Sequence, residues 1–272
     1  MSIIQNQIKQ MNVNQFEEFY NGCFENYENA FKNSSNEKRL QVEIYLELLE
    51  PYLLSDVSKK KYKVLDVGCG KGTLTQYLFK KIATKNKLSH LKFDIIGLDP
   101  HLNLLNEYKS SIEVLSNISV TEVIDCRLAD IKSELNNHKY DIILFDHCLY
   151  CLQNPDEFLE IIKNNLSGVG LVGLASRYSP ISYFRKHVLD IELPYSEYIL
   201  KTLNDNDINF NKIRYHSKFE IRDENILDVF SWIKMDEVLN KDEASNFLNQ
   251  IYNKEHDESH YEIYNVADVI LV

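Results

Sequence analysis

The sequence predicts a doubly wound α/β fold, in which helices cover both faces of a seven-stranded, mostly parallel sheet. Two observations predict this fold. Short apolar runs alternate along the chain with segments of helical periodicity, which is the pattern of parallel strands joined by crossover helices. The first apolar run also ends in a glycine-rich turn, which a ligand-binding sheet of this kind needs where a strand passes into a helix.

The individual elements follow from apolar periodicity, because backbone breaks are scarce in a chain with 8 Gly and 5 Pro. The expected strands cover residues 62–67, 93–98, 119–124, 140–145, 169–175, 213–221 and 261–272. The expected helices cover 14–31, a segment with Leu40, Leu46, Leu49 and Leu53 on one stripe, 73–82, 101–110, 155–165, 178–189, 196–204, 224–234 and 242–252. We therefore expect a helical lid over 1–61, a ligand-binding core over 62–175, and a C-terminal part of the same domain over 176–272. That last part contains a helical insertion after the fifth strand and the final strands; an interior position in the sheet would make the last strand structural.

Composition and charge argue against several classes of protein. The hydrophobic content of 44% and charged content of 26% are typical of a globular chain. A net charge of −11 argues against a nucleic-acid partner and favours cationic ligands. No window approaches the ~20 apolar residues of a membrane span, and the N-terminus lacks the features of a signal peptide. We expect a cytoplasmic protein with no membrane partner, as a monomer or a homodimer.

The five cysteines, an odd number, favour reduced thiols over a disulfide framework. Cys148 and Cys151 form an isolated C-x-x-C pair. Zinc sites of this kind need a second pair of ligands, so we expect no metal site and interpret the pair as two small packed side chains.

The turn after the first expected strand predicts a ligand site. Residues 64–72 read VLDVGCGKG, which places Asp66 within the strand and glycines at 68, 70 and 72. Gly68 permits a tight turn, Gly70 lets the backbone approach a ligand, and Gly72 allows close packing of the helix on the strand. In a doubly wound sheet, ligands bind beyond the carboxyl ends of the strands.

Acidic residues follow the next strands at the same edge of the expected sheet. Asp99 ends the second strand, where a carboxylate can accept hydrogen bonds from both hydroxyls of a ribose. Asp130 follows the third strand and is placed to accept from an adenine amino group, and Asp146 ends the fourth. The set predicts a nucleoside-containing cofactor. A nicotinamide dinucleotide is the rival interpretation, but its G-x-G-x-x-G motif needs the third glycine one residue later.

This set of residues resembles the class I S-adenosylmethionine-dependent methyltransferases, over roughly residues 62–175. In that family, E/D-x-G-x-G-x-G closes the first strand, and acidic residues follow the second and third strands. The resemblance implies S-adenosyl-L-methionine as the cofactor. It assigns cofactor-binding roles to Asp66, Gly68, Gly70, Gly72, Asp99 and Asp130, and Asp146 faces the same site.

Three further segments resemble the histamine N-methyltransferases. The first segment, residues 27–37, contains Tyr27 and Phe31 in the pattern Y-x-x-x-F, followed by an Asn/Ser loop and a glutamate. The second segment, residues 141–150, resembles the D-F-I-H-M-I-Q-M-L-Y of that family. The third segment, residues 264–272, resembles its N-N-T-L-S-F-I-V-I. The resemblance implies a substrate pocket lined by Glu37 (or Asn36), His147 and Asn265. His147 stands where that family has glutamine, and the loop before Glu37 is shorter.

Structural interpretations stay open for the same residues. Glu37 fits the first turn of a helix, where the dipole favours an acid, and Asn265 fits a turn. His147 is either a ligand contact and general base or a packed side chain. Aromatic residues at helical spacing pack a helix core as readily as they line a substrate site; they are Phe16, Phe19, Tyr20, Phe24 and Tyr27. Tyr150 and Tyr178 follow the fourth and fifth strands, where loops that bind a substrate lie.

The sequence therefore predicts methyl transfer from S-adenosylmethionine to a nitrogen of a small molecule, an amine or an imidazole-like ring. Catalytic rate in such a displacement comes mainly from alignment, and His147 is the candidate base for an acceptor that arrives protonated. One alternative is an O-methyltransferase of a secondary metabolite. The other is a paralogue that binds the cofactor without turnover.

Overall fold

The computed structural model describes a large part of the chain. The described residues are 35–125, 127, 135, 138–151, 156–179, 182, 195–222, 246 and 260–272; the side chains of 151, 156, 221, 222 and 260–263 are outside this description. The helices expected over 14–31, 224–234 and 242–252, and most of that over 178–189, lie outside the described residues. Internal contacts divide the chain into two compact units, the first of residues 1–38, 176–193 and 216–266 and the second of residues 39–175, 194–215 and 267–272. The predicted part boundaries at 61 and 175 stay predictions.

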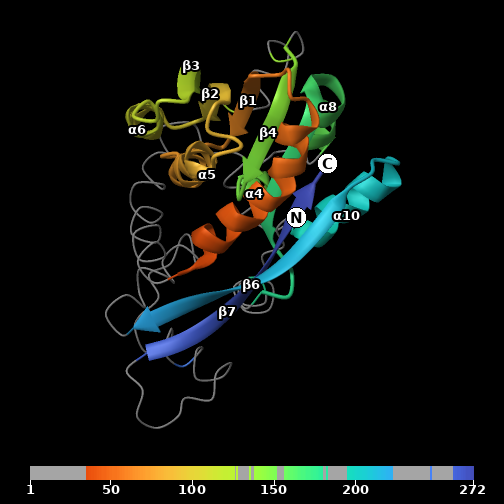
Figure 1. The fold of residues 1–272 in the computed structure, drawn as a ribbon. Coiled ribbons are helices and arrows are strands. Elements are labelled where there is room, and N and C mark those ends of the chain that lie inside the picture. Colours follow the sequence, from red (N-terminus) through yellow and green to blue (C-terminus); the bar gives the residue numbers. More distant parts are fainter. Residues whose placement is uncertain are drawn as a thin grey trace. The chain divides into compact units, whose positions relative to one another are not determined.

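The sheet has seven strands, as predicted (Figure 1). They are β1 (Lys61–Val67), β2 (Lys92–Asp99), β3 (Ile118–Asp125), β4 (Tyr140–Asp146), β5 (Leu166–Ala175), β6 (Asn211–Arg222) and β7 (His260–Leu271). The strand order is β3-β2-β1-β4-β5-β7-β6. The strands β1 to β5 are mutually parallel, and β7 runs antiparallel to β5. The C-terminal strand is thus interior, so the C-terminus is part of the sheet, and the carboxyl ends of β1 to β5 meet at one edge.

The described helices begin and end close to their expected positions (Figure 1). They are α4 (Glu37–Ser55), α5 (Thr73–Thr84), α6 (Leu102–Ile112), α8 (Asp156–Asn165) and α10 (Ser196–Asp205), with a 3-10 turn η2 (Leu149–Cys151). The start of α4 is capped as the Asn/Ser loop predicts, because the Glu37 amide donates to Ser35 Oγ at 3.1 Å. In the described part of the chain, no helix is long and apolar enough to cross a membrane.

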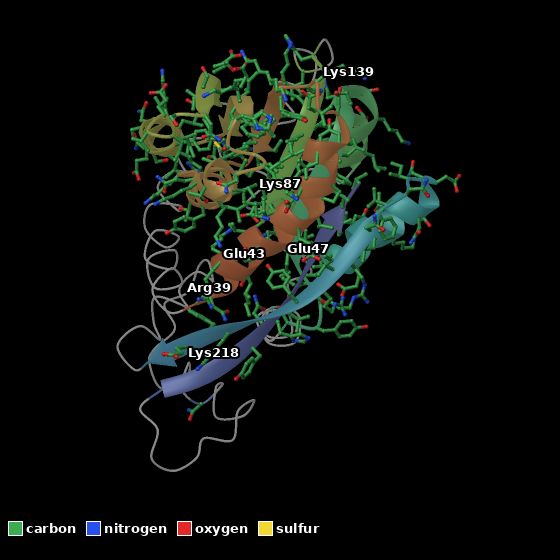
Figure 2. The ribbon with its side chains drawn as sticks, in the orientation of Figure 1. Arg39, Glu43, Glu47, Lys87, Lys139 and Lys218 are labelled. Carbon is green, nitrogen blue, oxygen red and sulfur yellow. The ribbon has the colours of Figure 1, made fainter. Side chains whose placement is uncertain are left out.

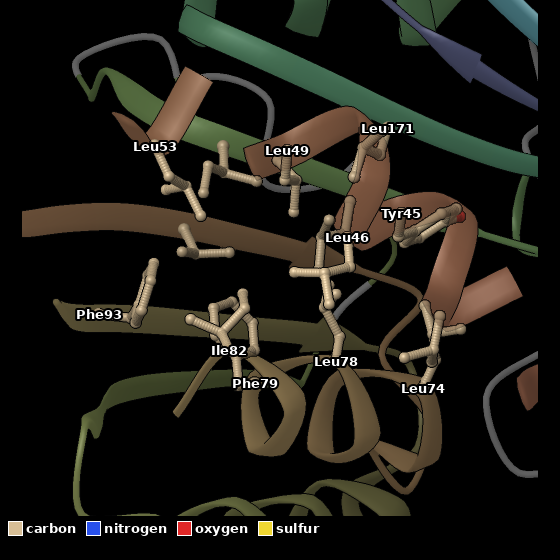
Figure 3. Packing of buried hydrophobic residues seen from close by; sticks show 14 of the residues in the cluster. Tyr45, Leu46, Leu49, Leu53, Leu74, Leu78, Phe79, Ile82, Phe93 and Leu171 are labelled. Carbon is tan, nitrogen blue, oxygen red and sulfur yellow. The ribbon is translucent and has the colours of Figure 1, made fainter. Parts of the chain in front are cut away.

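One side of helix α4 is exposed and carries Arg39, Glu43 and Glu47 at intervals of four residues (Figure 2). Its apolar side carries Leu46, Leu49 and Leu53, which pack in one cluster with residues of α5 and β2 (Figure 3). Burying each such side chain contributes about 1.5–3 kcal/mol. The cluster fixes α4 beside β1, the strand from which the glycine turn leaves.

A second apolar cluster covers the opposite face of the parallel strands. Side chains alternate along β1, so that Val64 belongs to the first cluster while Leu65 and Val67 belong to the second. In the second cluster, Phe145 of β4 meets Phe158 of α8 edge to face, with ring centroids 5.1 Å apart. Burial on both faces explains why the central strands read as continuous apolar runs.

Candidate active site

The turn after β1 adopts a left-handed backbone at all three glycines, with φ of 64° at Gly68, 50° at Gly70 and 77° at Gly72. A Cβ at Gly68 would overlap the side chain of Cys148, and one at Gly72 would come within 2.7 Å of the Tyr108 ring. A Cβ at Gly70 would meet nothing within 4 Å. Gly68 and Gly72 therefore serve close packing, while Gly70 faces open space that a ligand can enter.

Asp66 lies beneath this turn and is only 2% exposed. Its Oδ2 accepts hydrogen bonds from Thr75 Oγ1 at 2.5 Å and from Tyr108 Oη at 2.9 Å. These bonds join β1 to the helices α5 and α6. The carboxylate thus supports the turn from below.

Asp99, at the end of β2, holds the glycine turn from its other side. Its Oδ2 accepts from the Gly70 amide at 2.9 Å and its Oδ1 from the His101 amide at 3.1 Å. Burial raises the pKa of Asp99 to about 7, although the two amide hydrogen bonds oppose the shift. Each carboxylate oxygen can accept a second hydrogen bond, so a ligand beside Gly70 can reach the same carboxylate.

Polar side chains from α4 converge on the end of β4. Gln41 Nε2 donates to Asp146 Oδ1, and Tyr45 Oη lies 3.5 Å from the same oxygen. Both α4 residues are fully buried. The lack of a side chain at Gly173 of β5 provides the space for these two groups, because a Cβ there would overlap Gln41 Nε2 and come within 2.5 Å of Tyr45 Oη. Sequence reasoning missed Gln41, although a glutamine on the apolar stripe of an amphipathic helix is a signal that could have found it.

His147 follows Asp146 in a left-handed conformation, with φ of 51°, which is uncommon for a residue other than glycine. Its amide donates to the Gly173 carbonyl at 2.9 Å. Its ring Nδ1 lies 3.0 Å from Tyr150 Oη, and that oxygen accepts from the Ala175 amide at 2.9 Å. The imidazole is therefore fixed to the carboxyl ends of both β4 and β5, and Tyr150 acts as the link.

Within the first compact unit, the structure brings Glu37 and Asn265 together. Glu37 Oε2 accepts from Asn265 Nδ2 at 3.1 Å and from Ser217 Oγ at 3.2 Å. All three side chains are buried. Asn265 lies within β7, so the interpretation as a turn residue is wrong. Asn36 is engaged elsewhere, since its Oδ1 accepts from the Lys218 amide at 2.8 Å.

The remaining candidates are not placed in an enclosed site. Tyr178 is 67% exposed, and its amide donates to Ser176 Oγ at 3.2 Å. Tyr27 and Asp130 lie outside the described residues. Their binding roles stay predictions.

Comparison with known proteins identifies the part of the chain that carries the turn. Residues 58–178 match a family model described as a methyltransferase domain. This part of the chain is thus similar to methyltransferase domains. The matched residues include β1 to β5, the glycine turn, Asp99 and His147. None of the curated proteins is similar enough in sequence to match.

Solved structures show the same fold at low sequence identity. A presumed methyltransferase from Bacillus halodurans has a TM-score of 0.56 and 16% identity, over 83% of this chain and 96% of that one. The YcgJ protein from Bacillus subtilis has a TM-score of 0.52 and 12% identity, over 83% and 97%. The plantazolicin methyltransferase BamL, solved with a triazolic desmethylPZN analog and SAH, has a TM-score of 0.51 and 14% identity, over 99% and 97%. These likenesses support the doubly wound fold.

Proposed function

We propose that this protein methylates a nitrogen of a small molecule, an amine or an imidazole-like ring. One observation carries the proposal: an imidazole and a carboxylate, His147 and Asp146, stand together at the end of the strand next to the glycine turn. A sulfonium donor and a protonated amine are both cationic, which also suits a chain with a net charge of −11.

The residues of the turn fit S-adenosylmethionine. Open space at Gly70 admits the cofactor close to the backbone, and the Asp99 carboxylate beside it can accept from the ribose hydroxyls. Asp66 supports the turn through Thr75 and Tyr108. When bound, the cofactor supplies a methyl group on a sulfonium; the C–N bond forms from the nitrogen lone pair, while both electrons of the C–S bond stay on sulfur.

The contribution of the chain is to hold the nitrogen in line and to take its proton. Alignment supplies most of the rate of such a displacement. An unperturbed ammonium has a pKa of about 10 and is mostly protonated at neutral pH, so it must lose a proton before it can attack. Since Nδ1 of His147 contacts Tyr150, Nε2 is the ring atom that we assign to this proton transfer.

The buried Glu37, Ser217 and Asn265 support a finer proposal about the methyl acceptor. The resemblance to the histamine N-methyltransferases implies that Glu37 and Asn265 contact the substrate, and the hydrogen bond between these two side chains supports that proposal. A buried glutamate suits a cationic group of the substrate. His147 replaces the glutamine of that family, so we propose an amine other than histamine. A cytoplasmic location, and a monomer or homodimer, remain predictions.

A screen with methyl-labelled S-adenosylmethionine tests the proposal. Amines, imidazoles and phenols are supplied in turn, and formation of S-adenosylhomocysteine is measured with and without each compound. We expect turnover that depends on an added amine or imidazole, with NMR placing the labelled methyl on nitrogen. A label on oxygen would establish the O-methyltransferase alternative. Cofactor binding with no turnover across the screen would favour the non-catalytic paralogue.

A further inference from the structure

The amide of Gln41 is a buried polar group at the carboxyl edge of the sheet, and only part of its hydrogen-bonding capacity is used. The side chain is fully buried, on the face of α4 whose later turns carry Tyr45 and Leu49. Its orientation is fixed, because the Asp146 carboxylate can only accept hydrogen bonds and therefore faces Nε2. The carbonyl oxygen Oε1 then lies on the other side of the amide, and within the described part of the chain it has no hydrogen-bond partner.

A buried oxygen without a partner destabilises a fold by about 1–3 kcal/mol. Such groups are rare in native proteins, and each calls for an explanation. The surroundings of Gln41 offer one, because Asp146 and Gly173 lie at the ends of β4 and β5, where ligands of doubly wound sheets bind. A ligand with an N–H group would supply the missing hydrogen bond.

The position along the sheet decides which ligand this is. In the order β3-β2-β1-β4-β5, the glycine turn and Asp99 belong to β1 and β2, whereas Asp146 and Gly173 belong to β4 and β5 on the far side of β1. The glycine turn and Asp99, which we assign to the cofactor, thus lie at the ends of β1 and β2. The ends of β4 and β5 remain for the methyl acceptor. This side also carries His147.

We infer that Gln41 is a specificity-determining residue for the methyl acceptor, whose reacting nitrogen donates an N–H hydrogen bond to Gln41 Oε1 beside the Asp146 carboxylate. The inference rests on the proposed function and deepens it. As the C–N bond forms, the nitrogen becomes positively charged, and hydrogen-bond acceptors already in place stabilise that charge. Tyr45 contributes as a donor that holds Asp146, because burial and the neighbouring carboxylate raise the pKa of its hydroxyl well above the usual value.

Sinefungin tests this inference without knowledge of the natural substrate. In this analogue of S-adenosylmethionine, a carbon bearing a protonated amine replaces the methylated sulfur, so its ammonium occupies the position of the transferred methyl. S-adenosylhomocysteine lacks that group. The ratio of the two dissociation constants, measured by calorimetry, therefore reports the surroundings of the transferred methyl, which the reacting nitrogen approaches.

We expect the wild type to bind sinefungin about tenfold more tightly than S-adenosylhomocysteine, as one charge-assisted hydrogen bond allows. Gln41→Met should abolish this preference and leave the affinity for S-adenosylhomocysteine unchanged. Gln41→Glu keeps an oxygen in place of Oε1, and its carboxyl group, when protonated, donates to Asp146 as Nε2 does; it should retain the preference, an outcome that a purely structural role does not predict. Gln76→Met is the matched control, because Gln76 Nε2 donates to the Ser111 carbonyl within the same unit.

The outcomes separate this inference from the proposed function. If wild type, Gln41→Met and Gln41→Glu all show the same ratio, Gln41 does not contact the reacting nitrogen and the inference is overturned. If Gln41→Met does not fold, loss of the preference in Gln41→Glu overturns it equally. Failure of the wild type to bind either compound would contradict the proposed function itself.

Discussion

Replacement of His147 by alanine is expected to lower kcat by about 10²–10⁴-fold, the usual contribution of a general base. The imidazole is held between the ends of β4 and β5 through Tyr150, a position from which Nε2 can take the proton of an amine. Raising the pH deprotonates the amine in solution, so the variant should recover activity at high pH. His147→Gln should keep the hydrogen bonding but not the base, and should show the same pH rescue.

The histidine at 138 provides a matched control, because its side chain is exposed. His138→Ala should leave kcat and its pH profile unchanged. Melting temperatures of all variants check that the left-handed turn at 147 still forms. If His147→Ala, His147→Gln and wild type had equal kcat at every pH, His147 would be a packed side chain.

Replacement of Gly68 by alanine is expected to destabilise the fold by about 2–5 kcal/mol and to abolish cofactor binding. The residue combines a φ of 64°, which costs a non-glycine residue about 1–2 kcal/mol, with a Cβ that would overlap Cys148. Overpacking of this kind typically adds about 1–3 kcal/mol. Urea unfolding measures the change in the free energy of unfolding.

Two further variants separate the steric part from the backbone part. Gly70→Ala has a similar φ of 50° but open space around its Cβ, so it should cost only about 1 kcal/mol of stability while still weakening cofactor affinity. Cys148→Gly removes the atom that the new Cβ overlaps. The double variant Gly68→Ala/Cys148→Gly should therefore recover only the part of the lost stability that the steric overlap causes. Equal stability of Gly68→Ala and wild type would show that the turn does not pack as described.

The sequence predicted the parallel core closely, because its signals are local. Each central strand is an apolar run, and the three glycines in residues 64–72 predict the turn. The last strand was also predictable, since the chain ends in the apolar run from Val269 to Val272. The packing role of Gly72 against Tyr108 followed from its place at the start of a helix.

Features that depend on distant contacts were not predictable. Gln41 and Asp146 are 105 residues apart, and nothing in either segment signals that they meet. Asn265 lies within β7, but its hydrogen bond to Glu37 joins residues 228 positions apart, which the local sequence does not signal. Asp99 was expected to bind a ribose, whereas its bonds to the Gly70 and His101 amides depend on how two loops meet.

The central claim is that the β1 turn and Asp99 bind S-adenosylmethionine, and a calorimetric titration at several pH values tests it most directly. With a pKa of about 7 in the free chain, Asp99 must ionise to accept the ribose hydroxyls most strongly, so wild-type affinity should rise as pH increases through 7 and level off above about 8. Asp99→Ala should bind at least tenfold more weakly at pH 8, where two charge-assisted bonds are lost, and should lack this rise. Asp94→Ala, at the other end of β2 in a surface pair with Lys61, should behave as wild type. An affinity for S-adenosylmethionine that is unchanged by Asp99→Ala would contradict the account.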